Sequence, residues 1–217
     1  MRALLLDLGG TVFRSGSEMM ALLGDVEPAV RAVVARRGPL GPVHDALWDD
    51  MLAQVITERE YWARRSDEVG AALGREWPIS EFMHTLYALA GDSVIRPEAA
   101  ALIADARAVD IPVGFLTNDL RAFHGGTAMA SHPVLADVDV LVDGSVTGVL
   151  KPDPRAYALA VAGLGVEARH IVFVDDMPWN VTGAREAGMV ALELDLTDPA
   201  AAFAQARREL GLEAEAA

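Results

Sequence analysis

Short apolar runs alternate with amphipathic stretches along most of the chain. The runs Leu4–Leu6, Pro112–Leu116 and His170–Val174 are too short for surface helices, and each is followed at once by an acidic or hydroxyl-bearing residue. Runs of this kind are typical of parallel strands that are buried on both faces. Because the intervening stretches have helical periodicity, the pattern predicts an α/β fold with a Rossmann-like, doubly wound parallel sheet. Two more strands and two more helices are expected at residues 138–142, 190–194, 154–164 and 181–187.

Residues 15–92 have a different pattern, with helical periodicity and no convincing strand. Ser66 and Ser80 lie in candidate N-terminal cap regions. We infer that a helical domain at 15–92 is inserted into a core formed by residues 1–14 and 93–217. The helices expected in this domain are Pro28–Arg37, His44–Gln54, Thr57–Arg65, Ser66–Gly74 and Ser80–Ala90.

Most of the large aromatic residues lie in this inserted stretch. They allow two interpretations: a small hydrophobic core of the inserted domain, or the wall of an apolar substrate pocket. The core interpretation is preferred. The residues are Trp48, Tyr61, Trp62, Trp77, Phe82 and Tyr87.

Polar residues follow three of the predicted strands, at Asp7, Thr117 and the pair Asp175–Asp176. The carboxyl ends of parallel strands meet at one edge of a sheet, so these side chains should share a crevice. An ordinary turn would also explain the first segment alone, Asp7-Leu8-Gly9-Gly10. Clustered carboxylates repel one another unless a cation lies among them, and oxygen ligands suit Mg²⁺.

Lys151 adds a fixed positive charge just before a predicted helix, in the segment Lys151-Pro152-Asp153-Pro154. An acidic nucleophile, a hydroxyl group, a lysine and a metal site together form a set of groups suited to phosphoryl transfer.

Four segments in order resemble the four motifs of haloacid dehalogenase-like hydrolases. The resemblance spans nearly the whole chain and is closest to the helical-cap phosphatases, in particular sugar-1-phosphatase-like members. It implies that the inserted helical domain is a cap over the active site. The four segments are Asp7-Leu8-Gly9-Gly10-Thr11, Leu116-Thr117-Asn118, Lys151-Pro152-Asp153-Pro154, and Val174-Asp175-Asp176 followed by Asn180.

The resemblance also assigns roles to residues of these segments. It implies that Asp7 is the nucleophile and forms an aspartyl-phosphate, that Thr117 binds the transferring phosphoryl group, and that Lys151 holds both. Magnesium would be bound by Asp7, Asp175, Asp176 and the backbone carbonyl of Gly9. The residues expected to bind the substrate are Gly10, Thr11, Asn118 and Arg14, although Arg14 could equally be a surface arginine.

Two further positions have open roles. Asn180 could cap the helix that follows the acidic pair, support the magnesium site, or do both. Gly9 departs from the family pattern, because phosphatases of the family usually have a second aspartate there as general acid/base. Arg14 and His124 are the nearest candidates by sequence for replacing that acid.

The Gly9 departure keeps other functions open beside a magnesium-dependent phosphatase of small phosphorylated metabolites. One is a metal-independent hydrolytic dehalogenase, which the acidic pair Asp175–Asp176 disfavours. Others are a member acting on a prenyl phosphate or diphosphate, and a catalytically impaired phosphate-binding protein.

Composition narrows the choice of partner. The chain has 217 residues, no cysteine and a formal net charge of −14, which should repel nucleic acid and anionic membranes. The first strand begins by Ala3, which leaves no room for a signal peptide, and no apolar run is long enough to span a membrane. We therefore expect a cytoplasmic protein, monomeric or homodimeric, whose partner is a small-molecule phosphate ester and neither nucleic acid nor membrane.

Overall fold

The computed structural model describes residues 1–121, 132–136 and 138–212. The chain forms two compact units. The core unit comprises Met1–Phe13 and Ile95–Ala217, and the helical unit comprises Arg14–Val94. The role of the helical unit as a cap remains a prediction.

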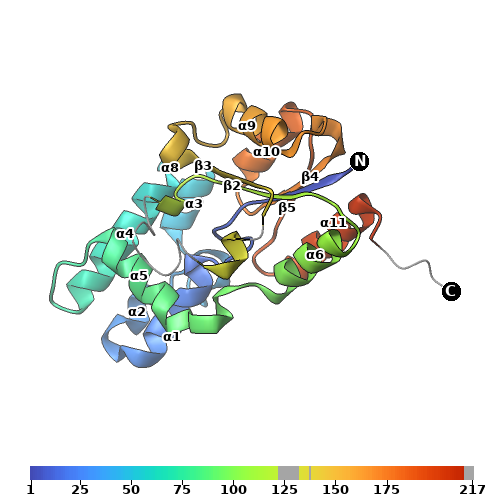
Figure 1. Cartoon of the computed structure of the whole chain (residues 1–217). Helices are drawn as coiled ribbons and strands as arrows, with labels where there is room; N and C mark the ends of the chain where they lie inside the picture. Colours follow the sequence, from blue (N-terminus) through green and yellow to red (C-terminus); the bar gives the residue numbers. More distant parts are fainter. Residues whose placement is uncertain (122–131, 137, 213–217) are drawn as a thin grey trace. The chain divides into compact units, whose positions relative to one another are not determined.

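A five-stranded parallel sheet is the centre of the core unit (Figure 1). The strand order β3-β2-β1-β4-β5 places the N-terminal strand in the middle of the sheet. The chain therefore builds one half of the sheet and then the other, on either side of β1, as in a doubly wound sheet. The predicted α/β fold class is thereby confirmed. The strands are β1 (Ala3–Leu6), β2 (Val113–Thr117), β3 (Val140–Asp143), β4 (Ile171–Asp175) and β5 (Val190–Glu193).

Helices cover both faces of this sheet, which explains why its central strands are uninterrupted apolar runs. α9 and α10 pack on one face, and α6 and α11 pack on the other (Figure 1). Leu5, Tyr157 and Phe173 belong to the buried cluster beneath α9 and α10. The helices of the core unit are α6 (Pro97–Ala108), α8 (Gly144–Thr147), α9 (Pro154–Leu164), α10 (Pro178–Glu186) and α11 (Pro199–Leu210).

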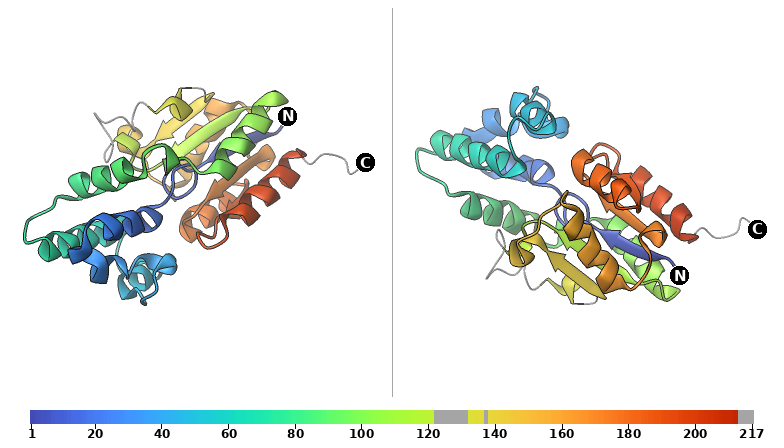
Figure 2. Two further views of the ribbon diagram at one scale, coloured as in Figure 1. Left: turned by 90° about the horizontal axis from the view of Figure 1, so that it is seen from below. Right: turned by 90° about the horizontal axis from the view of Figure 1, so that it is seen from above.

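The helical unit is built around α1, α4 and α5, with α1 and α5 side by side (Figure 2). Its helices are α1 (Gly16–Val26), α2 (Arg31–Val34), α3 (Ala46–Leu52), α4 (Glu58–Ala72) and α5 (Ile79–Ala90). Among the helices described in either unit, none has the length and apolarity needed to cross a membrane.

The helical unit differs from the expectations in several respects. Ser80 lies inside α5 and does not cap it, because the N-cap of this helix is Pro78. α1 was not predicted, although Ser15 and Glu18 form a capping box at its start. α4 is one helix and does not restart at Ser66, whose buried hydroxyl donates to the carbonyl oxygen of Trp77 and caps nothing. The helix expected from residue 28 is only α2, after a short 3₁₀ turn at Pro28–Val30.

The aromatic residues of the helical unit are buried, as the core interpretation predicts. Tyr61 is at the centre of one group, with its ring 5.5 Å from Trp48 and 4.9 Å from Trp62 in edge-to-face contacts. Its hydroxyl donates to the buried carboxylate of Asp45 at 2.9 Å, and the buried guanidinium of Arg65 is ion-paired with the same carboxylate. The group therefore combines apolar contacts with a buried polar network, in which the Arg65 Nε alone has no hydrogen-bond partner within the described residues.

Trp62→Ala should lower the free energy of unfolding by roughly 3–5 kcal/mol, the usual cost of removing a large core side chain. The Trp62 ring fills the space beside Gly16, where even a Cβ atom would overlap it. Chemical denaturation measures the effect, and Arg64→Ala on the exposed side of α4 is the control. A Trp62→Ala protein with parental stability and an altered order of substrates would instead support the pocket interpretation.

Candidate active site

Lys151 links the carboxyl ends of β1, the central strand, and its neighbour β4. Its Nζ donates to Asp7 Oδ1 at 2.5 Å and to Asp175 Oδ2 at 2.6 Å, and all three side chains are buried. Asp7 directly follows β1 and Asp175 ends β4, and these parallel strands are neighbours in the sheet. The topology thus delivers both carboxylates to one edge, where the loop before α9 supplies the lysine.

The Lys151 ammonium group is held in its charged form. Burial alone would lower the pKa of Lys151, but the carboxylates of Asp175 and Asp7 outweigh this effect and raise the pKa above its ordinary value. The lysine therefore remains protonated throughout the neutral range. One cation therefore bridges two buried acidic side chains.

Both oxygens of Asp175 are engaged by protein donors. Oδ1 accepts from the Met177 N–H at 2.8 Å, and the Asn180 Nδ2 lies 3.1 Å from each oxygen. The Asn180 backbone carbonyl in turn accepts from the buried Tyr157 hydroxyl at 2.8 Å. Asn180 lies inside α10, whose N-cap is Met177, so its predicted capping role is wrong; its side chain contacts Asp175 instead.

Asp176 packs against the loop that follows β1. Gly10 has a φ of +82°, and a Cβ atom built on it would overlap the Asp176 carboxylate. Only glycine combines this backbone conformation with such a close approach. The Asp176 carboxylate therefore lies beside the loop that leads away from Asp7.

The end of β2 contributes Thr117 and Asn118. Thr117 is buried and is the register partner of Asp143 on β3. The Asn118 side chain accepts from the Lys151 N–H at 2.7 Å and donates to the Lys151 carbonyl at 3.1 Å. Asn118 therefore positions the lysine segment, whereas substrate binding by Asn118 remains a prediction.

Asp143 is a residue that the sequence analysis missed. Its Oδ2 accepts from the Arg121 N–H at 2.8 Å, and its Oδ1 accepts from the Ser145 N–H at 2.9 Å. It thereby ties the segment after Thr117 to the end of β3. Its position at the carboxyl end of an edge strand, just before a glycine, was the available clue.

The remaining predicted site residues are less closely engaged. Thr11 is fully buried, and its Oγ1 has no hydrogen-bond partner within the described residues. Arg14 belongs to the helical unit, where its Nε donates to the Ser93 carbonyl at 2.9 Å and its Nη1 contacts Glu18 at 3.3 Å. Gly9 is exposed. His124 lies outside the described residues.

The acidic side chains at this edge of the sheet are the possible ligands for Mg²⁺. Within the described part of the chain, no three Asp, Glu, His or Cys side chains are grouped as a ready-made metal site. Asp175 is fully engaged by its donors, which leaves Asp7 and Asp176 as candidate ligands. A pair of carboxylates still fits Mg²⁺, which usually takes one or two carboxylates and completes its octahedron with water and substrate oxygens.

Comparison with known proteins assigns the chain to a family. Residues 1–188 match the model of haloacid dehalogenase-like hydrolases, so the chain belongs to this family of hydrolases. The family resemblance noted from the sequence is thereby confirmed. Membership of the helical-cap phosphatase branch remains a prediction.

Named relatives include phosphatases. The phosphatase MT3486 of Mycobacterium tuberculosis is 33% identical over 134 residues, which cover 54% of this chain and 62% of that protein. Validoxylamine A 7'-phosphate phosphatase of Streptomyces hygroscopicus is 26% identical over 168 residues, 75% of this chain and 78% of the relative. The structure of L-2-haloacid dehalogenase from Xanthobacter autotrophicus has a TM-score of 0.55 and 20% identity, covering 89% of this chain and 77% of the dehalogenase, which shows a shared fold.

Proposed function

We propose that this protein is a magnesium-dependent phosphatase of small phosphorylated metabolites, of the helical-cap branch, with Asp7 as nucleophile. The observation that carries the proposal is the buried bridge from Lys151 to Asp7 and Asp175, together with a second acidic side chain, Asp176, beside the same loop. Phosphatases among the named relatives support the same reaction class. A phosphate-release screen over a broad metabolite panel, with and without magnesium, tests the proposal.

The reaction proceeds in two displacements at phosphorus. A carboxylate oxygen of Asp7 forms a bond to phosphorus as the ester oxygen leaves and takes up a proton. Water then attacks the phosphorus of the aspartyl-phosphate, which releases inorganic phosphate and restores the Asp7 carboxylate. Lys151 remains protonated throughout, orients the nucleophile and offsets charge on the phosphoryl oxygens.

Asp7, Asp176 and the Gly9 carbonyl would hold the metal. Bound magnesium would supply positive charge that neutralises the phosphoryl oxygens. Asp175 has a different task in this proposal: it fixes Lys151 and does not bind the ion directly. In this proposal the hydroxyl of Thr117 binds the phosphoryl group, as does the hydroxyl of Thr11, which has no hydrogen-bond partner within the described residues.

Magnesium should stabilise the parent protein, by about 2.7 kcal/mol when its concentration is about a hundredfold above the dissociation constant. Asp176→Asn should remove most of this gain, because the amide is a much poorer magnesium ligand. Melting temperatures with and without magnesium measure the effect, with Glu167→Gln, an exposed carboxylate paired with Arg169, as the control. Equal melting temperatures and equal activity with and without magnesium in the parent would contradict the metal assignment.

A hydrolytic dehalogenase is the second candidate, favoured by the absence of a carboxylate at Gly9. In that reaction Asp7 would attack a carbon atom and displace halide without a metal. Release of halide from a 2-haloacid in the presence of a chelator, without phosphate release from any ester, would support this candidate over the phosphatase.

A further inference from the structure

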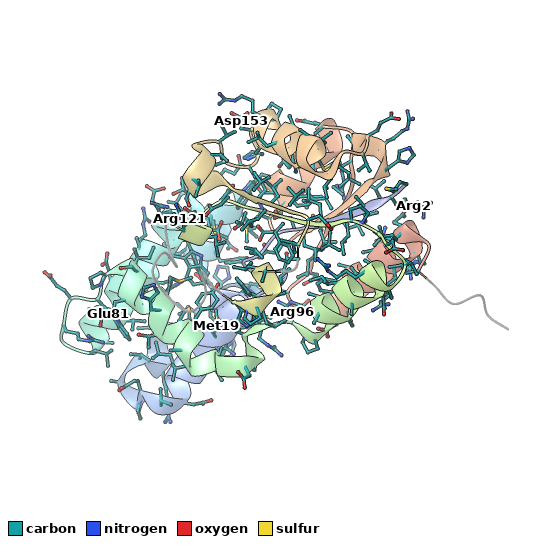
Figure 3. The ribbon with its side chains drawn as sticks, in the orientation of Figure 1. Arg2, Met19, Glu81, Arg96, Arg121 and Asp153 are labelled. Carbon is teal, nitrogen blue, oxygen red and sulfur yellow. The ribbon has the colours of Figure 1, made fainter. Side chains whose placement is uncertain are left out.

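Arg96 contacts three consecutive residues of the loop that follows the nucleophile. Its Nη2 donates to the Gly10 carbonyl at 2.9 Å, its Nε to the Thr11 carbonyl at 3.2 Å, and its backbone N–H to the Val12 carbonyl at 2.9 Å. Arg96 directly precedes α6 (Figure 3) and is only 2% exposed.

We propose that Arg96 is a positioning residue for the nucleophile loop, defined here as residues 8–13. The guanidinium fixes the Gly10 and Thr11 peptides, and through them the spacing between Asp7 and Asp176. The proposal rests on the proposed function, because it concerns how this chain prepares its site for magnesium and the phosphoryl group.

The charged guanidinium of Arg96 is buried, which carries an energetic cost. A guanidinium remains ionised and is costly to bury unless polar groups surround it. Two carbonyl oxygens of the nucleophile loop meet part of that requirement for Arg96. Because the donors of a guanidinium form a rigid planar fork, both carbonyls are held in a fixed relation to each other.

Gly10 is constrained by a second neighbour as well. Its Cα lies against the Asp176 carboxylate so closely that no Cβ atom could be added. At the far end of the loop, the Phe13 N–H donates to the Leu8 carbonyl at 2.7 Å and closes the turn. The loop therefore contacts both Arg96 and Asp176, and a shift of the Gly10 peptide would change where Asp176 can lie.

Arg185 provides a matched control in the same unit. Its Nε donates to the Ala191 carbonyl at 3.0 Å, so it also links a guanidinium to the backbone, but at β5 instead of the nucleophile loop. The variants to compare are Arg96→Lys, Arg96→Gln and Arg185→Lys. Lysine keeps the charge without the fork, whereas glutamine keeps two donors without the charge.

The experiment combines three measurements on the full chain. Amide hydrogen exchange follows residues 8–13, the magnesium-dependent shift in melting temperature reports metal affinity, and kcat and KM are measured with an aryl phosphate. In Arg96→Lys we expect faster exchange in the nucleophile loop, magnesium affinity and kcat each reduced about 10- to 100-fold, and KM within about threefold of the parent. Arg185→Lys should stay close to the parent in all three.

The possible results separate this proposal from the proposed function. Parental loop exchange, magnesium affinity and kcat in folded Arg96→Lys and Arg96→Gln would overturn the positioning role. Failure of both variants to fold would also overturn it, by assigning Arg96 to the fold as a whole. A parent with no phosphatase activity and no response to magnesium would instead refute the proposed function, while the exchange data would still show whether Arg96 holds the loop.

Discussion

Asp7→Asn should reduce phosphate release by at least about 10⁴-fold while the protein remains folded. An amide is a far weaker nucleophile than a carboxylate, so no covalent intermediate should form. The fold should persist because Lys151 retains its contact with Asp175, 2.6 Å from Nζ. Turnover of an aryl phosphate and the melting temperature measure the two parts of this expectation, and beryllium fluoride should form an adduct at Asp7 in the parent alone.

Glu167→Gln is a suitable control for this experiment, because it removes an exposed carboxylate of the same unit that lies outside the four motif segments and is paired with Arg169. The control should retain parental turnover. Parental turnover in folded Asp7→Asn would rule out the covalent mechanism.

The sheet and the main site residues were predictable because they are local in sequence. Each of β1, β2 and β4 is a buried apolar run that ends at a polar residue, and parallel topology brings such ends together. Asp7, Lys151 and Asp175 thus meet as the pattern suggested. No long-range information was needed beyond the order of the segments.

The different contacts of Asp175 and Asp176 could not be predicted from the sequence. The two residues are chemically identical neighbours, and only three-dimensional contacts distinguish them. Asp175 meets Lys151 and Asn180, whereas Asp176 meets the Cα of Gly10. Such differences depend on partners far away in the sequence, so a motif alone cannot express them.

The contacts of Arg96 could not be predicted for a related reason. An arginine followed by proline at a helix start is an ordinary pattern, and its partners Gly10 and Thr11 precede it by more than eighty residues. Every residue also has a backbone carbonyl, so the sequence does not indicate which carbonyls accept a hydrogen bond from an arginine. The helical unit was harder to predict in general, because the divisions between its helices depend on tertiary contacts such as that of Ser66 with Trp77.

Gly9 should make the rate of phosphate release depend steeply on the leaving group. Without a carboxylate at this position, no side chain there can protonate the departing oxygen or activate water. General acid/base assistance is typically worth about 10²–10⁴-fold, so simple alkyl phosphates should react slowly. Aryl phosphates, acyl phosphates, anomeric sugar phosphates and diphosphates have more acidic leaving groups and need less assistance. A series of aryl and alkyl phosphates measures this dependence in the parent.

Gly9→Asp should make the rate depend less on the leaving group, because it should accelerate hydrolysis of the alkyl esters by about 10²-fold or more. The structure can accept the substitution: Gly9 is exposed, its φ is outside the left-handed region, and no described atom lies within 4 Å of a Cβ built there. Gly9→Asn is the matched control, because it has the same shape but cannot exchange a proton at neutral pH. Equal gains from aspartate and asparagine would show that proton transfer is not the cause. Equally fast parental turnover of all esters would mean that another group already acts as the acid.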